Sequence, residues 1–234
     1  LPMGTHWLWH SFGAVAVHLL ILYIHGGDRR KNGTVQQGWK DGDRKLRRTG
    51  RRRAAAALRA AGYEVEELEV PSILDAAKAW FSVAILEIKE GLDPIARQHG
   101  SQTIQDIFDY YYEMSDMVDY QGYMAGVADR SGIIRPWNVF LDEYPLVLTP
   151  FMMRPTYDYD YDETFAGSKD IFDSAIYSYG INYMGLPAGN VSIGLVEERP
   201  CGIQVVGQRF REDLILDALE VIEQDVGIIT PMLW

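Results

Sequence analysis

The side chains with the clearest catalytic potential are an adjoining serine and lysine, Ser168 and Lys169, in the stretch FAGSKD. A serine hydroxyl attacks a carbonyl carbon only when a base removes its proton, and a neutral lysine can be that base. Side chains of adjacent residues do not ordinarily point toward each other, and no nearby glycine-rich loop offers backbone N–H groups to an oxyanion. The sequence therefore does not favour a Ser168–Lys169 dyad.

Other reactive side chains also lack the neighbours that their chemistry requires. Cys201 is the only cysteine, which excludes an internal disulfide, and its place between Pro200 and an apolar run favours a buried structural thiol. His6 and His10 have the i, i+4 spacing of helical metal ligands, but no glutamate or third ligand accompanies them. The acids of TYDYDYDE, residues 156–163, lack the glycine and asparagine order of a calcium loop. We expect a solvated loop there, no metal site and no cofactor.

Charge divides the chain into two unlike parts. Residues 1–53 hold 11 of the 22 Lys and Arg and 3 of the 33 Asp and Glu, so they carry +8 and the remainder carries −19. An acidic body repels phosphate backbones, which argues against nucleic-acid binding outside the basic segment. Residues 26–53 are Gly-rich, basic and aperiodic, so they predict a solvated linker; a basic patch for nucleic acid or an anionic membrane is the alternative.

Residues 7–24, WLWHSFGAVAVHLLILYI, form an uncharged run at the short limit of a membrane-spanning helix. His10, His18, Ser11 and Gly13 weaken that interpretation, and the basic residues follow the run, whereas in a signal peptide they precede it. A buried strand or hairpin, or a segment without a specific structure, is favoured over a membrane anchor. With a single cysteine, we expect a cytoplasmic protein, with membrane anchoring as the alternative.

From residue 51 onward the pattern is that of a folded α/β domain. RRRAAAALRAAG predicts a helix that ends at Gly62, and YEVEELEV predicts a strand. Ser72 and Asp75 resemble a capping box that opens an amphipathic helix over residues 73–92. Apolar residues recur at intervals of about three and four residues from residue 103 to 127, which predicts one long helix. Pro136 is suited to the first turn of another helix.

The later residues predict buried strands and a final helix. PLVLTP, residues 145–150, and CGIQVVG, residues 201–207, are short apolar runs typical of buried strands. REDLILDALEVIE, residues 211–223, predicts a helix with Glu212 and Asp213 in its positive first turn. Strands and helices alternate without an internal repeat, which indicates a layered α/β domain.

Four phrases in order resemble the amidase signature family of serine hydrolases: RRAAAALRAAGYEVEELEVPS, FLDEYPLVLTP, NYMGLPAGNVSIGL and RPCGIQVVGQRFREDLILDALEVIE. The resemblance covers roughly residues 51–231. It implies the C-terminal portion of an amidase-type α/β/α sandwich with a mixed sheet. The predicted organisation is a non-family segment over residues 1–50, followed by the C-terminal part of an amidase domain over residues 51–234.

The third and fourth phrases contain residues suited to close turns. Asn182 is expected to start a turn that Gly185 and Pro187 continue, while Gly189 and Gly194 allow close backbone approach. Ser192 and Ile193 stand where the family has a small residue and a proline, which is expected to loosen one turn. Gln204 is the only polar side chain of its strand, so we expect it to hydrogen-bond internally, in preference to contacting a substrate.

The resemblance implies a Ser–Ser–Lys triad, with a desolvated lysine as base, contributed by the first half of the domain. The glycine- and serine-rich loop of that half has no match, because Gly26-Gly27 is followed by Asp28. The two Lys-Asp dipeptides, at Lys40 and Lys169, both lack the apolar strand that precedes the family's lysine. The prediction therefore names no catalytic residue, leaves the binding residues unknown and expects no metal ligand.

The resulting hypothesis is an amidase-family protein that by lineage hydrolyses carbon–nitrogen bonds but is catalytically incomplete, from a truncated or frame-disrupted coding sequence. Its expected partners are a missing N-terminal amidase half, or a second copy through an exposed apolar face, and the parent's substrate is a small-molecule amide. The alternative is a non-catalytic interaction or membrane-tethered module. A third possibility is an enzyme with another nucleophile, which Ser168 would supply.

Overall fold

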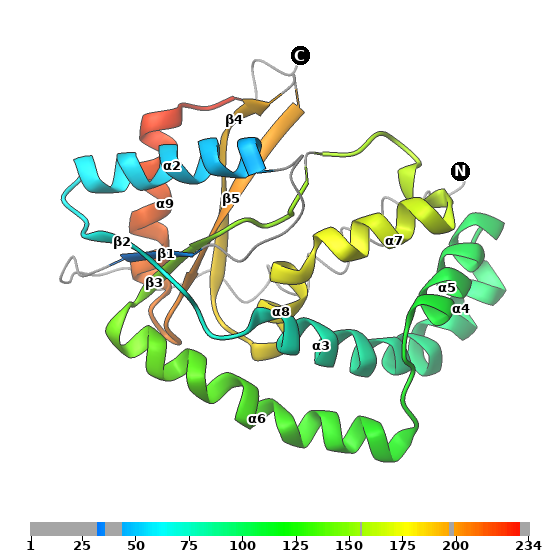
Figure 1. The fold of residues 1–234 in the computed structure, drawn as a ribbon. Coiled ribbons are helices and arrows are strands. Elements are labelled where there is room, and N and C mark those ends of the chain that lie inside the picture. The colour runs from blue at the N-terminus through cyan, green and yellow to red at the C-terminus, as the bar shows by residue number, and fades with distance from the viewer. Residues whose placement is uncertain (1–31, 36–43, 155, 197–198, 230–234) are drawn as a thin grey trace.

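The computed structural model describes residues 32–35, 44–154, 156–196 and 199–229 of the chain, and its centre is a five-stranded sheet (Figure 1). Its strands are β1 (Asn32–Val35), β2 (Val65–Leu68), β3 (Leu146–Thr149), β4 (Ala188–Val196) and β5 (Arg199–Gly207). Across the sheet their order is β2-β1-β3-β5-β4. β1 is parallel to β2 and β3, whereas β5 is antiparallel to β3 and β4. The predicted mixed sheet is confirmed.

One face of the sheet is covered by α2 (Arg44–Ala60) and α9 (Glu212–Val226). Alanines in α2 and branched residues in α9 meet the side chains of β3 and β5, because both helices carry apolar residues at three- and four-residue spacing. The buried members of this cluster include Ala54, Leu58, Leu148, Val205 and Ile222. The small alanines bring α2 close to the sheet.

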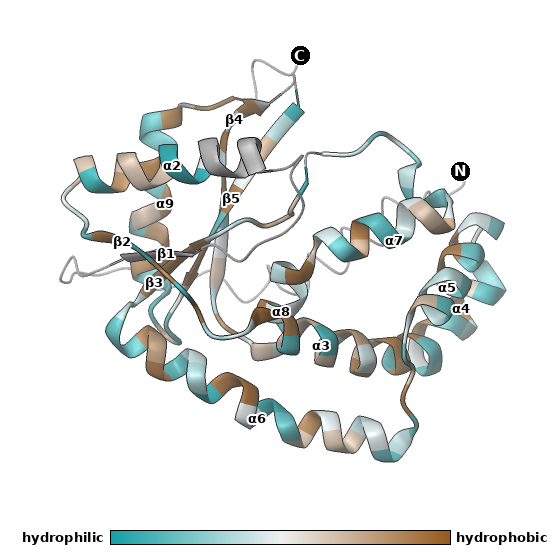
Figure 2. Cartoon of the chain, viewed as in Figure 1, coloured by the Kyte–Doolittle hydropathy of each residue, from teal (hydrophilic) through white to brown (hydrophobic). Residues whose placement is uncertain are grey.

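The other face is covered by α3 (Ile73–Glu87), α6 (Tyr120–Glu143) and α8 (Ile176–Met184). Trp137 of α6 is completely buried in this layer, and its indole N–H donates to the Ser72 carbonyl at 3.4 Å. Val147 and Val206 contribute the strand side of the same cluster. Figure 2 shows hydrophobic residues on the central strands and a mixture of hydrophobic and hydrophilic residues along α6, as expected for a helix with one buried face. The molecule is therefore an α/β/α sandwich.

A smaller core lies away from the sheet, where the end of α3 meets a π-helical turn η1 (Ile88–Leu92), α4 (Asp93–His99) and α5 (Gln102–Met114). Ile85, Ile104 and Phe108 are buried in it. The remaining helical elements are a 3-10 turn η2 (Tyr161–Glu163) and α7 (Phe165–Ser174), which packs against α5.

Most predicted elements are confirmed, together with the local signals that define them. α2 ends before Gly62, whose φ of +92° is accessible chiefly to glycine. The hydroxyl of Ser72 accepts from the Asp75 N–H at the start of α3. β3 is buried along its whole length, and α9 begins with Glu212 and Asp213 in its first turn.

Three predictions differ from the structure. Residues 103–127 form two helices, because α5 ends at Met114 and Asp119 caps α6 by accepting from the Gly122 N–H at 2.8 Å. Pro136 lies inside α6 instead of at a helix start. The predicted linker does not hold for residues 32–35 and 44–53, which belong to β1 and α2.

The turn residues act at different points from those expected. Asn182 lies within α8, and the turn begins at Gly185, a left-handed cap whose N–H donates to the carbonyls of Ile181 and Asn182. In β4 the register with β5 shifts between Ser192 and Gly194, where Gly194 has φ +115°. This irregularity is a β-bulge at the site predicted to be loosened.

Candidate functional site

Ser168 and Lys169 are directed to different partners, so they do not form a dyad. The buried Ser168 hydroxyl donates to the Asp162 carbonyl at 2.6 Å. The Lys169 ammonium pairs with the Asp173 carboxylate one turn along α7, at 2.7 Å, and its side chain is 52% exposed. The serine is thus a buried structural group and the lysine a surface charge.

The other lysines whose side chains the structure describes, Lys78 and Lys89, are also exposed. The ammonium of Lys89 lies 5.6 Å from the centre of the Tyr112 ring. A lysine becomes neutral near physiological pH when burial disfavours its charge. None of these three exposed lysines is in an environment that would make it a proton acceptor.

Cys201 is half-buried in β5 and contributes to the apolar cluster beneath α2 and α9. Burial raises the pKa of the Cys201 thiol above its ordinary value, so the thiol is protonated at neutral pH. A nucleophilic cysteine needs the opposite shift, toward thiolate. The environment fits the structural role predicted for this residue.

A polar row crosses the sheet at the end of β3, where Thr149, Gln204 and Asn190 are neighbours on three adjacent strands. The Thr149 hydroxyl donates to the Gln204 side-chain carbonyl at 3.1 Å. Thr149 is completely buried and Gln204 is 4% exposed, whereas Asn190 is exposed at the edge of the sheet. The predicted internal hydrogen bond of Gln204 is confirmed.

The segment that follows β3 crosses the start of β5 before it reaches α7. The Thr156 hydroxyl donates to the Pro200 carbonyl at 2.8 Å, and the Arg199 guanidinium donates to the Thr156 carbonyl at 2.6 Å. Arg199 also pairs with Asp158 at 2.7 Å. These contacts attach the start of the TYDYDYDE stretch to β5, and Asp162 is its one buried acid among the described residues.

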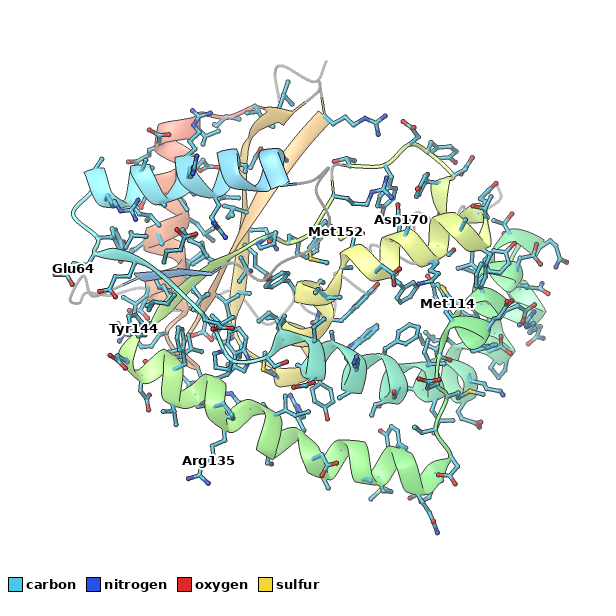
Figure 3. The ribbon with its side chains drawn as sticks, viewed as in Figure 1. Glu64, Met114, Arg135, Tyr144, Met152 and Asp170 are labelled. Carbon is cyan, nitrogen blue, oxygen red and sulfur yellow. The ribbon has the colours of Figure 1, made fainter. Side chains whose placement is uncertain are left out.

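Arg154 is the centre of a cluster that sequence reasoning missed. Its guanidinium pairs with Asp170 of α7, which also accepts from the Tyr161 hydroxyl at 2.8 Å. Figure 3 shows the position of Asp170 on α7. The guanidinium carbon lies 4.5 Å from the centre of the Tyr161 ring and 5.9 Å from that of Tyr157. The buried Nε of Arg154 has no acceptor among the described residues.

Aromatic side chains from α3, α5, α7 and α8 pack together on the other side of α7. Tyr179 stacks on Trp80 with ring centres 4.3 Å apart, and Phe172 lies 4.5 Å from Tyr111. Burial raises the pKa of the Tyr111 and Tyr179 phenols well above the ordinary tyrosine value, with the Asp162 charge adding to the shift at Tyr111. The buried Tyr179 hydroxyl has no hydrogen-bond partner among the described residues.

The polar row, the Arg154 cluster and the aromatic cluster are together taken as the candidate site. The flat aromatic surfaces suit a planar ligand, and the Arg154–Asp170 ion pair adds one charged group of each sign. The site lacks a described base for activating a hydroxyl. Its sequence signals were Gln204, the single polar side chain of its strand, and the alternation of aromatic residues and acids shortly after Arg154.

Several sequence predictions concern residues outside the described ranges. They are His6 and His10, the apolar run 7–24, Gly26-Gly27-Asp28, and Lys40-Asp41. Within the part of the chain that the structure describes, no helix is both long and apolar enough to span a bilayer. In the same residues no three His, Cys, Asp or Glu side chains gather as metal ligands would.

Comparison with solved structures supports the fold. The 6-aminohexanoate cyclic dimer hydrolase in complex with its substrate superposes with a TM-score of 0.65 at 20% identity, over 85% of this chain and 45% of that one. A bacterial aryl acylamidase gives a TM-score of 0.62 at 18% identity, over 84% and 44% of the two chains. At these identities the likeness concerns the fold alone.

Sequence comparison extends the likeness to the family. Indoleacetamide hydrolases of Bradyrhizobium diazoefficiens and Bradyrhizobium japonicum are each 32% identical to this chain, over 78% and 80% of its length. This chain spans 35% and 41% of the length of those relatives. One subunit of the glutamyl-tRNA(Gln) amidotransferase of Enterococcus faecalis is 26% identical over 74% of this chain and 40% of its own length.

The sequence model of the Amidase family matches residues 34–216, which begins ahead of the predicted boundary at residue 51. The division of the chain at residue 50 stays a prediction. Because the match extends over well more than half of the chain, and the four motif phrases lie almost wholly inside it, the protein belongs to the amidase family.

Proposed function

We propose that this chain supplies the C-terminal part of an amidase domain, which hydrolyses the carbon–nitrogen bond of an aromatic carboxamide once the catalytic part of the domain is joined to it. The observation that carries the proposal is the family match over residues 34–216, with 32% identity to two indoleacetamide hydrolases. An arylacetamide is accordingly the substrate class we propose. The lone cysteine supports a reducing, cytoplasmic setting.

The physical demands of amide hydrolysis support the proposal that this chain is catalytically incomplete. The attacking hydroxyl needs a base, and a lysine acts as that base only when it is desolvated. Lys78, Lys89 and Lys169 are exposed, and the Ser168 hydroxyl is already used in a hydrogen bond to a backbone carbonyl. We therefore propose that nucleophile, base and oxyanion donors come from the part of the domain that precedes the matched region in the relatives.

The aromatic and Arg154 clusters support an aromatic substrate. Stacked rings such as Trp80 and Tyr179 can accept another flat ring in an offset arrangement, which is worth roughly 0.5–1.5 kcal/mol per aromatic pair beyond area burial. A carboxamide is neutral, so it requires hydrogen-bond donors and acceptors and no compensating charge. The unpartnered Arg154 Nε and Tyr179 hydroxyl are groups of that kind.

The test is an ammonia-release assay with indole-3-acetamide, phenylacetamide and acetamide. The chain is assayed alone and after co-expression with the N-terminal part of the Bradyrhizobium relative that precedes the matched region. We expect no turnover by the chain alone, and turnover that prefers the two aromatic amides when both parts are present.

The Ser168→Ala variant serves as the matched control for the competing hypothesis of a nucleophile within this chain. It should leave the activity of the co-expressed pair unchanged, because Ser168 makes only a structural contact. Saturable hydrolysis of any carboxamide by the purified chain alone, abolished in Ser168→Ala, would overturn the proposal.

A further inference from the structure

The exposed apolar side chains of this protein gather away from its sheet. Both faces of β3 and of the second half of β5 are buried, since Leu146–Thr149 and Ile203–Gly207 are all buried. The structure therefore differs from the expectation that a missing half would leave an apolar sheet face exposed there. Among the described residues, more than half of the large apolar side chains that are exposed lie between residues 92 and 139, in the helical part ahead of β3.

The first half of α6 is attached to the body of the protein along one side. The Tyr123 hydroxyl donates to the Glu87 carboxylate of α3 at 2.7 Å, and the Arg130 guanidinium donates to the Tyr183 carbonyl of α8. The Tyr183 hydroxyl in turn donates to the Gly126 carbonyl. Tyr123, Gly126 and Arg130 are three and four residues apart, so they share this side of the helix.

A second side of the same helix is exposed and apolar. Tyr120, Met124 and Val127 are 72%, 50% and 46% exposed. With Ser131, which is also exposed, they follow the alternating three- and four-residue spacing of a heptad seam. At about 100° per residue these four residues lie in one narrow strip, roughly a quarter turn around the helix from the attached side. We call them the α6 stripe.

The α6 stripe has the properties of a surface on which another helix packs. Single exposed apolar side chains are ordinary, whereas a row of them at heptad spacing is the pattern by which two helices pair. The residues beside the stripe on its solvent side are Ala125, Ala128 and Gly132, and all three are exposed. Because they are small, a second helix can approach α6 closely.

The stripe is self-complementary when a second α6 packs against it in the opposite direction. Its midpoint lies between Met124 and Val127. A two-fold axis through that point brings Met124 of one copy against Val127 of the other, and Tyr120 against Ser131. In such an isologous contact each pair occurs twice. The two central layers are then apolar, and the large Tyr120 side chain lies opposite a small residue.

The same symmetry joins opposite charges. Asp116 and Asp119 are exposed ahead of the stripe, and Arg135 is exposed one turn beyond it. The Arg135 side chain extends away from the molecule (Figure 3) and has no ion-pair partner in the described part of the chain. Asp116 and Arg135 are the same number of residues from the axis, so antiparallel pairing puts each arginine beside the acids of the other copy, whereas parallel pairing would place like charges together. Charge complementarity therefore selects a second, antiparallel copy as the occupant.

We propose that the α6 stripe is a docking surface for a second copy of this chain, with the two α6 helices antiparallel about a two-fold axis. The proposal does not depend on the proposed function, since it uses no residue of the candidate site. Contact between two helices buries less surface than a standard protein interface, so we expect a reversible dimer that dissociates on dilution.

Sedimentation equilibrium of the full chain over a range of concentrations measures this association. We expect a mass that rises with concentration from that of one chain toward that of two. Met124→Lys should raise the dissociation constant about a hundredfold, because the symmetry repeats the loss of apolar burial in both copies. Val139→Lys is the matched control: it makes the same kind of change at another exposed apolar position of α6, outside the stripe, and should leave the dissociation constant unchanged.

A charge exchange tests the partner of Arg135. Arg135→Asp should weaken the dimer several-fold, since each of the two symmetric contacts becomes a repulsion between acids. Adding Asp116→Arg to that variant should restore association, because the opposite charges are then exchanged but still face each other. All of these side chains are exposed, so the midpoint of thermal unfolding should stay close to that of the wild type in every variant.

Cross-linking tests the orientation. In the Cys201→Ala background, Met124→Cys should be joined between copies by a bis-maleimide that spans about 10 Å, since the two positions lie near the axis. Val139→Cys should not be joined, because antiparallel pairing places it about 40 Å from its counterpart along the helices.

Three results would overturn the proposal: a chain that stays monomeric at every concentration, a Met124→Lys variant that associates as strongly as the wild type, or efficient cross-linking of Val139→Cys. Each of them would leave the proposed function unaffected.

Discussion

The buried hydrogen bond between Thr149 and Gln204 predicts a strong energetic coupling. Thr149→Val and Gln204→Met each keep the side-chain shape but leave the other partner without its hydrogen bond. Thr149 is completely buried and Gln204 is 4% exposed, so water cannot replace the missing partner. A buried polar group without a partner costs about 1–3 kcal/mol, and each single variant should lose that much stability.

The double variant should recover most of the loss. With both polar groups replaced by apolar groups of similar shape, the unfolding free energy should return to within about 1 kcal/mol of the wild type. The coupling energy from the double-mutant cycle would then be about 1–3 kcal/mol. Urea unfolding followed by the fluorescence of the tryptophans, including the buried Trp137, measures all four proteins.

Gln224→Met is the matched surface control. Gln224 donates to Glu220 at 3.2 Å on the exposed side of α9, and its replacement should change stability by less than about 0.5 kcal/mol. Two results would refute the description of a desolvated polar row. One is that the single variants lose no more unfolding free energy than this control, and the other is that the double variant loses as much as the two single variants together.

Two other predictions concern packing and the thiol. Gly180→Ala would place a methyl group 2.5 Å from the fully buried Ile73, so the melting temperature should fall by several degrees. In the control Gly132→Ala, at an exposed position of α6, the new methyl group meets nothing within 4 Å, so the melting temperature should rise slightly. An equal rise in melting temperature for both variants would contradict the close packing of α3 on α8. Burial raises the folded pKa of Cys201 above its unfolded value near 9. The contribution of this thiol to stability is therefore fully present below the unfolded pKa, and it is lost as the pH rises through the folded pKa. Above pH 9 the urea midpoint of the wild type should fall more steeply than that of Cys201→Ala.

Local signals account for the parts of the fold that the sequence predicted. The hydroxyl of Ser72, the missing side chain of Gly62 and the apolar run at residues 146–149 each act on their own segment, so reading that segment is sufficient. The break between α5 and α6 was missed because the apolar period continues through Met114, Met117 and Val118. Only the cap at Asp119 indicates the new helix.

Pro136 was misplaced because its local preference competes with burial. Within α6 it lacks the N–H that would bond to the carbonyl of Gly132, and such a loss normally ends a helix. Burial of Ile134, Trp137 and Leu141 on the side of α6 that faces the core outweighs this penalty. The Arg135 side chain extends away from the molecule on the other side of the helix (Figure 3).

The candidate site was largely invisible in the sequence, since its contacts join distant residues. Arg154 and Asp170 are separated by a turn and most of a surface loop, and Trp80 meets Tyr179 only because α3 packs on α8. Gln204 was recognisable because one polar side chain interrupts an apolar strand. Its partner Thr149 lies on a strand whose register no local pattern specifies.

The scaffold and the chemistry of this protein depend on different physical requirements. A sheet buried between helices needs apolar periodicity, which each segment carries by itself. A neutral lysine needs enclosure on every side. Lys169 shows the difference: it is 52% exposed and paired with Asp173, and covering α7 would bury an ion pair, which favours keeping the charge. Enclosure alone would therefore not convert this lysine into a base.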